Sequence, residues 1–210
     1  MTVLITGANR GIGAALVSAY AARGETAIGT ARKSANGLWP LDVTRPEEFA
    51  ALTDRLATTD LSLLVCNAGI YSDKGRTLED LEPTIWAEAY ATNVTGAFLT
   101  IRACLPALTR GKGKIALISS AMASDARAPG GAYIYRSSKA ALLNLGRNLA
   151  KDLEIPVGIY HPGWVQTDMG GSGADITVDQ AVDGLVARFD ELSPQTTGIF
   201  QSYDGTPIPF

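Results

Sequence analysis

The sequence is poor in the residues that build metal and redox sites. Its 210 residues include one histidine, His161, and two cysteines, Cys66 and Cys104. A single histidine cannot build a His-rich metal site, and the spacing of the cysteines matches neither a zinc cluster nor a redox pair. Both cysteines lie in apolar stretches, and free cysteine is among the most buried residue types. We therefore expect two reduced, buried thiols and no metal site.

The sequence also lacks an excess of basic residues and any long apolar run. Its 18 Lys and Arg residues are outnumbered by 21 Asp and Glu residues, which gives a formal net charge of -3 at pH 7. Such a chain is not attracted to phosphate backbones or anionic membranes, so we expect neither nucleic acid nor a membrane as a partner. The runs TVLITG and LSLLVCNAG are too short to span a bilayer. The first strand is expected to begin at Thr2, which leaves no room for a signal peptide and favours a cytoplasmic protein.

The residues that are present have an ordinary globular composition, 46% hydrophobic and 19% charged. A chain of this length most naturally forms one domain, residues 1–210. Short β-rich runs alternate with helix-periodic segments, which predicts an α/β fold: a single doubly wound parallel sheet, or Rossmann fold, with helices on both faces. The predicted strands lie at residues 2–7, 25–32, 61–69, 113–120 and 155–163, with a last strand within 198–210. The predicted helices lie at residues 11–24, 83–108, 135–153 and 178–192.

Two connections depart from a regular alternation. The interval Lys33–Leu41 is too short and too rich in Gly and Pro for a full helix. We expect it to cross between strands as a loop, although a parallel crossover usually carries a helix. The segment Thr167–Asp175, TDMGGSGAD, consists mostly of small residues and is expected to be flexible. We refer to it as the lid segment.

The loop ITGANRGIG joins the first predicted strand to the first predicted helix. Its glycines, Gly7, Gly11 and Gly13, stand at G-x-x-x-G-x-G spacing. Gly7 permits a sharp turn, Gly11 lets a pyrophosphate approach the backbone, and Gly13 allows close helix packing. The helix N-terminus supplies free N–H groups and positive potential for phosphates. This context predicts a dinucleotide site, to which Asn9 and Ile12 of the same loop also contribute.

The residues after the second strand indicate which dinucleotide binds. An acidic residue there would accept hydrogen bonds from a free ribose 2′-hydroxyl and so mark NAD(H). This strand ends instead in GTARK, with Arg32 and no acid nearby. A guanidinium grips a 2′-phosphate in a bidentate manner, and Arg10 of the glycine loop is expected to join it from the other side. The sequence therefore predicts NADP(H) in preference to NAD(H).

With these residues the chain resembles the short-chain dehydrogenase/reductase family almost from end to end. The motifs that carry the resemblance are TGANRGIG, LDV (41–43), NAG (67–69), ATNVTGAF (91–98), ISS (118–120), Tyr135-x-x-x-Lys139 and HPGWVQTDM (161–169). Each is weak alone, but the ordered set is specific. The C-factor and Sniffer-like carbonyl reductases are the most similar subgroup, because they share HPGWV.TDMGG and an ending of the kind YDGTPIPF.

The resemblance implies roles for further cofactor-binding residues. Asp42 and Val43 would border the adenine, with Asp42 accepting from its amino group, and Asn67, Ala68 and Gly69 would line the ribose side. The residues that would hold the nicotinamide carboxamide are Pro162, Gly163, Val165 and Thr167. By the same resemblance, the helices around Asn93 and Tyr135 would pair across a homodimer.

The family's four catalytic positions would fall on Asn93, Ser120, Tyr135 and Lys139. Tyr135 meets Lys139 one helical turn later, whereas Tyr133 meets the uncharged Ser137, and residues i and i+4 share a helix face. We expect Lys139 to lower the pKa of Tyr135 from its usual value of about 10 and to reach a nicotinamide ribose hydroxyl. Tyr135 then serves as the acid in carbonyl reduction and as the base in alcohol oxidation. Tyr133 is expected to line the substrate pocket or to pack near the helix start.

The two other catalytic positions supply hydrogen bonds. Ser120 ends a predicted strand, so its hydroxyl is expected to project from the carboxyl edge of the sheet and donate to the substrate oxygen. Ser119 would point to the opposite face. Because the separation between Ser120 and Tyr135 is longer than in many family members, Ser119 or Ser124 is an alternative donor. Asn93 lies in a predicted helix, and the resemblance implies that it holds a water in a proton relay with Lys139.

These residues predict an NADPH-dependent oxidoreductase that transfers a hydride to a small carbonyl substrate: an aldehyde, a ketone or a quinone. The alternative is a nucleotide-sensing or signalling protein of the same fold with little turnover, since a fold does not determine a function. The intact Tyr135–Lys139 pair favours the enzyme, because a sensor does not need an acid.

Overall fold

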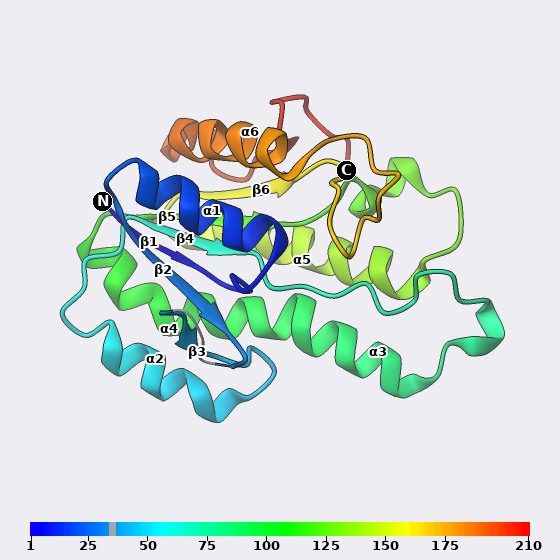
Figure 1. Cartoon of the computed structure of the whole chain (residues 1–210), viewed down its shortest axis with the longest axis horizontal. Coiled ribbons are helices and arrows are strands. Elements are labelled where there is room, and N and C mark those ends of the chain that lie inside the picture. Colours follow the sequence, from blue (N-terminus) through cyan, green and yellow to red (C-terminus); the bar gives the residue numbers. More distant parts are fainter. Residues whose placement is uncertain (34–36) are drawn as a thin grey trace.

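A computed structural model describes residues 1–33 and 37–210 and contains a seven-stranded sheet (Figure 1). The strands are β1 (Thr2–Ile5), β2 (Thr26–Ala31), β3 (Trp39–Pro40), β4 (Leu63–Cys66), β5 (Lys114–Ile118), β6 (Val157–His161) and β7 (Phe200–Ser202). Their order is β3-β2-β1-β4-β5-β6-β7, and every neighbouring pair is parallel. The chain winds outward from β1 through β2 and β3, then from β4 to β7 in the other direction. The doubly wound parallel sheet predicted from the sequence is confirmed.

Helices connect these strands. Those of the described residues are α1 (Gly11–Ala22), α2 (Phe49–Arg55), α3 (Pro83–Tyr90), α4 (Gly96–Arg110), α5 (Tyr133–Asp152) and α6 (Val178–Glu191). The helix predicted over residues 83–108 is divided into α3 and α4 by a π-helical turn, Ala91–Thr95. Sequence periodicity does not predict α2, because this short helix buries only Phe49 and Leu52. Among the described residues, no helix is both long and apolar enough to cross a bilayer.

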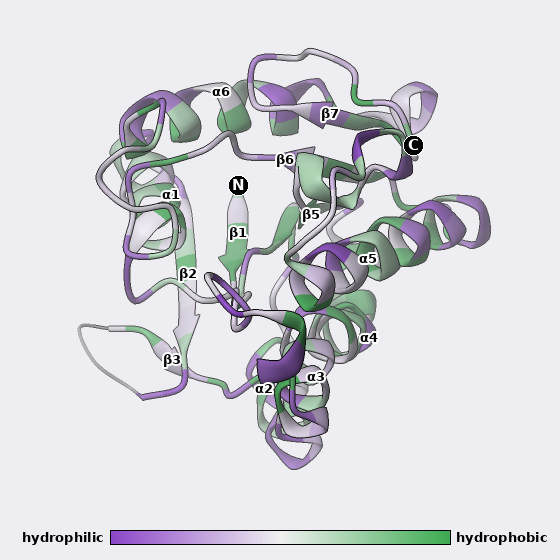
Figure 2. Ribbon diagram, turned by 90° about the vertical axis from the view of Figure 1, so that its right-hand side faces the viewer, coloured by the Kyte–Doolittle hydropathy of each residue, from purple (hydrophilic) through white to green (hydrophobic). Residues whose placement is uncertain are grey.

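The sheet is covered on both faces, and each face has its own core (Figure 2). Leu16 and Tyr20 of α1 pack with Leu185 and Phe189 of α6 over one face. Helices α2, α4 and α5 cover the other face. Side chains of a strand alternate between these cores, so Val3 and Ile5 join the first core while Leu4 joins the second. The predicted arrangement of helices on both faces is therefore confirmed.

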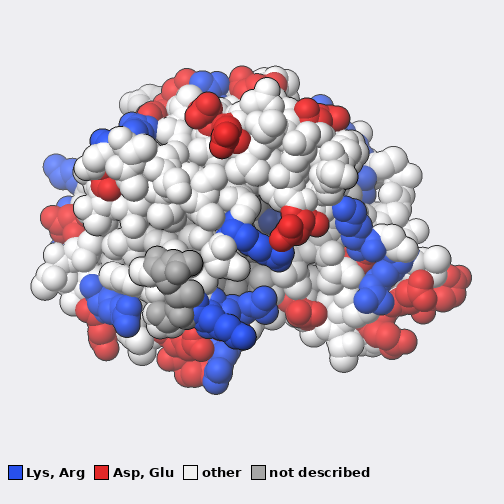
Figure 3. Space-filling view, viewed as in Figure 1, with Lys and Arg blue, Asp and Glu red and all other residues white. Residues whose placement is uncertain are grey.

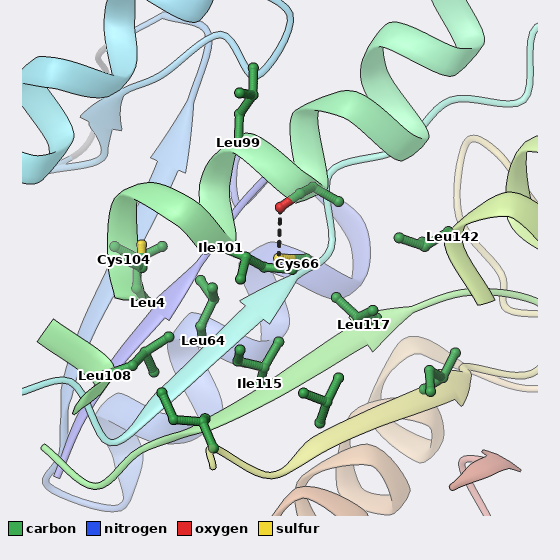
Figure 4. Close-up of a cluster of buried hydrophobic side chains, with 14 of the residues drawn as sticks. Leu4, Leu64, Cys66, Leu99, Ile101, Cys104, Leu108, Ile115, Leu117 and Leu142 are labelled. Carbon is green, nitrogen blue, oxygen red and sulfur yellow. Dashed lines mark hydrogen bonds between the residues drawn. The ribbon is translucent and has the colours of Figure 1, made fainter. Parts of the chain in front are cut away.

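Both cysteines lie in the core under α4 (Figure 4). Cys66 and Cys104 are free and buried, and the Cys66 thiol lies 4.0 Å from the carbonyl oxygen of Ala97. Burial raises the pKa of both thiols, that of Cys104 to about 12. The predicted reduced, buried thiols are confirmed, and both side chains pack as small apolar groups.

The crossover after β2 lies partly outside the described residues. The interval Lys33–Leu41 is predicted to be a loop, and its residues 34–36 are not described. Its described residues form the short strand β3 and contain no helix.

The direction of the chain reverses between β1 and β4. The loops after these two strands start at the same carboxyl edge of the sheet, and in open α/β sheets ligands bind at such a switch point. The loops after β5 and β6 leave the same edge. The predicted site residues therefore come together at one edge of the sheet.

Helix α5 approaches the sheet closely at Gly146. A side-chain carbon at this position would lie 2.7 Å from Leu117 Cδ1 and 2.8 Å from Ile159 Cγ1. Such distances are too short for a carbon in ordinary contact, so glycine sets the separation between α5 and strands β5 and β6. This separation also fixes the depth at which the start of α5 reaches the carboxyl edge.

We expect Gly146→Val to lower the free energy of unfolding by about 1–3 kcal/mol, the usual cost of overpacking a core. Urea denaturation measures this change. The control is Asn144→Val, which places a valine at an exposed position of the same helix. Equal stability of Gly146→Val and the wild type would show that glycine does not set this contact.

Candidate active site

The glycine loop is shaped to receive a phosphate group. Gly7 and Gly11 have φ angles of +67° and +54°, which favour glycine over residues with a side chain. A side-chain carbon at Gly13 would lie 2.4 Å from the carbonyl oxygen of Gly7. Helix α1 begins here without a side-chain cap, so its first N–H groups are free to bind an anion. These residues fit the pyrophosphate of a dinucleotide.

Other loop residues lie on either side of this helix start. Asn9 and Arg10 are exposed, and Ile12 is half-buried against the core under α1. Asn67 braces the loop from β4, because its side-chain amide donates to the carbonyl oxygens of Thr6 and Gly7 at 2.9 and 3.2 Å. Asn67, which is predicted to lie on the ribose side, thus supports the turn at the start of the glycine loop.

Thr6 is a residue that the sequence analysis misses. Its hydroxyl accepts hydrogen bonds from the backbone N–H groups of Asn67 and Ala68 at 3.0 and 3.1 Å. These contacts join the turn after β1 to the turn after β4. Gly69 follows this turn, and a side-chain carbon there would lie 3.2 Å from Lys139 Nζ and 3.3 Å from Asn93 Oδ1. The absence of a side chain at Gly69 keeps the space next to these two polar groups open.

The residues that are predicted to border the adenine lie after β3. Val43 is buried against Gly96, and the Asp42 carboxylate accepts from the hydroxyl and N–H of Thr44 at 2.7 and 3.0 Å. Burial acts to raise the pKa of Asp42. The bonds from Thr44 and the nearby charges of Arg32 and Arg45 outweigh burial, so the pKa is lowered. Arg32 is therefore close to Asp42 and exposed, as a phosphate ligand at this end would need to be.

The side chain of Arg10, which is predicted to bind a 2′-phosphate together with Arg32, is paired with the lid segment in this structure. Its guanidinium Nη1 lies 2.5 Å from Oδ2 of Asp168 in the lid segment, and both side chains are exposed. A side-chain carbon at Gly11 would lie 3.4 Å from Thr167 Cγ2, so the glycine loop and the lid segment are in close proximity. The space-filling view shows Lys and Arg side chains interspersed with Asp and Glu side chains on this face (Figure 3). An ion pair between segments distant in sequence cannot be predicted from local pattern.

The loop after β6 leads into the lid segment. Pro162 and Gly163 begin it, and Gly163 has a φ angle of +91°. Val165 is buried and bridges to Ile176, and Thr167 Oγ1 accepts from the N–H of Gly170 at 3.1 Å. An open pocket of about 350 Å³ is lined by Gln166, Thr167, Asp168, Gly171 and Ser172.

The lid segment is also tethered on its far side. Lys74 Nζ donates to the carbonyl oxygens of Met169 and Gly170 at 2.8 and 3.3 Å. Together with the Arg10–Asp168 pair, these bonds attach three consecutive residues of the lid segment, 168–170, to parts of the chain distant in sequence.

Tyr135 and Lys139 lie on the buried face of α5, one turn apart. Lys139 Nζ donates to the carbonyl oxygen of Ile118 at the end of β5, at 2.8 Å, and lies 5.8 Å from the centre of the Tyr135 ring. Tyr133, by contrast, is 46% exposed. The structure thus places Tyr135, and not Tyr133, beside the lysine.

Burial governs the protonation of both groups. Burial raises the pKa of Tyr135 to about 12, although a hydrogen bond with Ser120 acts to lower it. Burial lowers the pKa of Lys139 to about 8. The expected lowering of the Tyr135 pKa by Lys139 is therefore not found in this structure. The physical reason is burial: the cost of removing the phenolate from water outweighs the lowering effect of the Ser120 hydrogen bond.

The three candidate serines have different surroundings. Ser120 is hydrogen-bonded to Tyr135, and its hydroxyl accepts from the N–H of Met122 at 3.1 Å. Ser119 instead donates to the carbonyl oxygen of Lys139 at 3.1 Å, behind the site. Ser124 is buried, and its hydroxyl has no hydrogen-bond partner among the described residues. Of the three, Ser120 is the one next to the phenol.

Asn93 lies in the π-helical turn between α3 and α4. Its side-chain oxygen accepts from the N–H of Ile70 at 2.8 Å, and its amide donates to the Ile70 carbonyl at 3.0 Å and to the Ser138 hydroxyl at 2.9 Å. π-turns are frequent at functional sites, where they aim a side chain. Here the turn directs Asn93 toward α5 and the loop after β4.

Two further residues of that loop, Tyr71 and Asp73, lie at the site, and Asp73 is not predicted from the sequence. The ring of Tyr71 stacks on that of Tyr135 with a centroid distance of 4.2 Å. Asp73 is 3% exposed and accepts from the N–H groups of Ile134 and Tyr135 at 2.8 and 3.1 Å. The only signal in the sequence for Asp73 is that a charged residue follows shortly after the NAG motif.

Among the described residues, no cluster of three or more His, Cys, Asp or Glu side chains could hold a metal ion.

Comparison with known proteins shows similarity over the whole chain. The family model of the short chain dehydrogenases matches residues 1–175. The C-signal of Myxococcus xanthus is 37% identical over 166 residues, which cover 76% of this chain and 99% of that protein. Among solved structures, the carbonyl reductase Sniffer of D. melanogaster has a TM-score of 0.93 at 29% identity and covers 100% of this chain and 99% of its own. The NADPH-bound carbonyl reductase from chicken fatty liver has a TM-score of 0.87 at 32% identity, with 100% and 98% covered.

The buried lysine makes a pH-dependent contribution to stability that Lys139→Met removes. An unfolded lysine keeps its proton up to a pH of about 10.5, whereas the folded one loses it above about 8, so between these values the unfolded state holds more protons. Stability of the wild type relative to Lys139→Met therefore rises with pH between 8 and 9.5, by about 1–2 kcal/mol. Urea denaturation of both proteins at pH 7, 8 and 9.5 measures this difference, in which the other titrating groups cancel. A constant difference would show that the buried lysine stays charged throughout this range, so that burial does not lower its pKa.

Proposed function

We propose that this chain, which belongs to the short-chain dehydrogenase family, reduces a small carbonyl compound, an aldehyde, ketone or quinone, with NADPH as the hydride donor. The observation that carries the proposal is the buried Tyr135–Lys139 pair, with Ser120 on the phenol, at the same sheet edge as the glycine loop. The similarity to carbonyl reductases supports the substrate class.

The protonation of Tyr135 suits the reductive direction. With a pKa of about 12 the phenol keeps its proton at neutral pH, so it can donate that proton to the carbonyl oxygen. When bound at the glycine loop, NADPH would supply the hydride for the carbonyl carbon. The Ser120 hydroxyl donates a hydrogen bond to the same oxygen as negative charge develops on it.

Lys139 and Asn93 act behind the phenol. At neutral pH the Lys139 ammonium is charged and stabilises the phenolate that forms when Tyr135 gives up its proton. Its proton is then available to restore the phenol. The Asn93 side chain is hydrogen-bonded to the Ile70 backbone and the Ser138 hydroxyl. As the family resemblance implies, Asn93 orders a water through which a proton returns to Lys139.

The preference for NADP(H) rests on Arg32 and Arg10. Arg32 is exposed at the adenine end with no acid in its place, and Arg10 is free to turn from Asp168 to a phosphate, since an exposed ion pair is worth about 1 kcal/mol or less. The NADPH in the similar chicken carbonyl reductase supports this preference.

We further propose that the chain forms one domain, assembles as a homodimer and acts in the cytoplasm. The alternative of a nucleotide-sensing protein is not favoured. The C-signal is similar in sequence, but the pair of Tyr135 and Lys139, with Ser120 and Asn93 around it, is what proton transfer needs.

We expect Tyr135→Phe to lower kcat for carbonyl reduction by about 10²–10⁴-fold, the usual contribution of a general acid, with NADPH binding unchanged. NADPH oxidation on a panel of aldehydes, ketones and quinones measures kcat, and fluorescence titration measures binding. The control is Tyr133→Phe, the exposed neighbour, for which we expect wild-type rates. Full activity of Tyr135→Phe would refute the proposed acid.

We expect Arg32→Ala to weaken NADPH binding by about 10–100-fold, the equivalent of a lost charge-assisted hydrogen bond, and to leave NADH binding unchanged. Asp168→Asn should strengthen NADPH binding by no more than about fivefold, because it frees Arg10 from an exposed ion pair. Asp175→Asn, at the exposed end of the lid segment, is the matched control. Equal losses for NADPH and NADH in Arg32→Ala, or tighter NADH binding by the wild type, would contradict the preference.

A further inference from the structure

Helix α5, which carries Tyr135 and Lys139, has no cap of its own. The residue before it, Ala132, has a φ angle of +49° and offers no side-chain hydrogen bond. Asp73, which lies 61 residues before Ile134, supplies the cap instead. Its Oδ2 accepts from the N–H of Ile134 at 2.8 Å, and its Oδ1 accepts from the N–H of Tyr135 at 3.1 Å. A carboxylate at a helix N-terminus satisfies free N–H groups and complements the helix dipole.

The cap is buried as well as remote. Asp73 is 3% exposed, and a buried carboxylate is tolerated only where hydrogen bonds compensate for its lost hydration. The two N–H groups of α5 provide this compensation. The carboxylate and the helix start therefore depend on one another, and the position of each fixes that of the other.

The rest of the same loop contacts the catalytic residues. The Tyr71 ring stacks on that of Tyr135, the Ile70 backbone is bonded in both directions to the Asn93 side chain, and Gly69 lies next to Lys139. Residues 69–73 thus touch three of the four proposed catalytic residues, and Asp73 is where this loop is joined to the backbone of α5.

We propose that Asp73 is a positioning residue for the acid: it fixes the first turn of α5, so that the Tyr135 phenol stays between Tyr71 and Ser120. The inference rests on the proposed function, in which Tyr135 is the acid. Tyr135 is the third residue of α5, in the turn that frays first when a cap is lost. Lys139 lies a turn further in and is held separately by the Ile118 carbonyl. Loss of Asp73 therefore displaces the phenol and leaves the lysine and the cofactor site in place.

The test compares Asp73→Ala and Asp73→Asn with the wild type. We expect Asp73→Ala to lower kcat by about 10–100-fold, because misplacement of a reacting group by about 1 Å costs this much. The dissociation constant of NADPH should not change. Asparagine keeps one acceptor oxygen for the helix N–H groups, so Asp73→Asn should recover a large part of the lost kcat and carries the test if the alanine variant does not fold.

The control is Asp80→Ala. Asp80 also caps a turn, since it accepts from the N–H of Thr77 at 3.0 Å, but it is exposed and local. We expect wild-type kcat and NADPH binding for this variant. A general sensitivity of the enzyme to the loss of caps would instead lower kcat in both alanine variants and would overturn the inference.

A second measurement does not depend on turnover. Amide hydrogen exchange should show that Asp73→Ala, or Asp73→Asn to a smaller extent, loses protection at Ile134 and Tyr135, while the turn that contains Lys139 stays protected. Unchanged protection, unchanged kcat, or a parallel loss of NADPH affinity would each overturn the positioning role. If the wild type reduces no carbonyl compound, the proposed function fails, and exchange at Tyr135 still decides whether Asp73 holds the helix start.

Discussion

The burial of Tyr135 and Lys139 within one turn of α5 is the constraint on which the site depends. Both side chains are buried, and burial moves their pKa values in opposite directions, toward the neutral form of each. The phenol therefore keeps its proton at neutral pH, as the proposed acid must, and the pKa of the lysine is lowered to about 8. Such a pair is costly to bury, and the Ile118 carbonyl that accepts from Lys139 offsets only part of this cost.

Several features of the fold serve this burial. Gly146 lets α5 lie close to β5 and β6, so that Lys139 reaches the end of β5. The π-helical turn before α4 directs Asn93 to the loop after β4, and this loop covers the phenol with Tyr71. The glycine loop lies at the same edge of the sheet, so the switch between β1 and β4 brings Tyr135 and the start of α1, the proposed acid and the proposed phosphate site, to one edge.

The sequence predicts those features that depend on local pattern. The alternation of apolar and helix-periodic runs is enough for the doubly wound sheet, and the i,i+4 spacing is enough to select Tyr135 over Tyr133. Contacts between distant segments are not predicted: the Arg10–Asp168 pair, the Asp73 cap and the bracing of Thr6 on Asn67 each join residues far apart in sequence. The predicted direction of the Tyr135 pKa shift is wrong for a related reason. Helix spacing reveals the neighbouring lysine but not how deeply the phenol is buried, and burial raises its pKa. Helix α2 is missed because two buried residues do not establish a period.

The most direct test is a titration of the Tyr135 phenol itself. Tyrosine labelled with ¹³C at Cζ reports its ionisation by NMR, and the spectrum of Tyr135→Phe assigns the signal. If burial controls the site, the Tyr135 signal of the free protein stays that of a phenol from pH 6 through pH 9. Formation of the phenolate between pH 6 and 8 would show that the lysine charge outweighs burial, and would contradict this account.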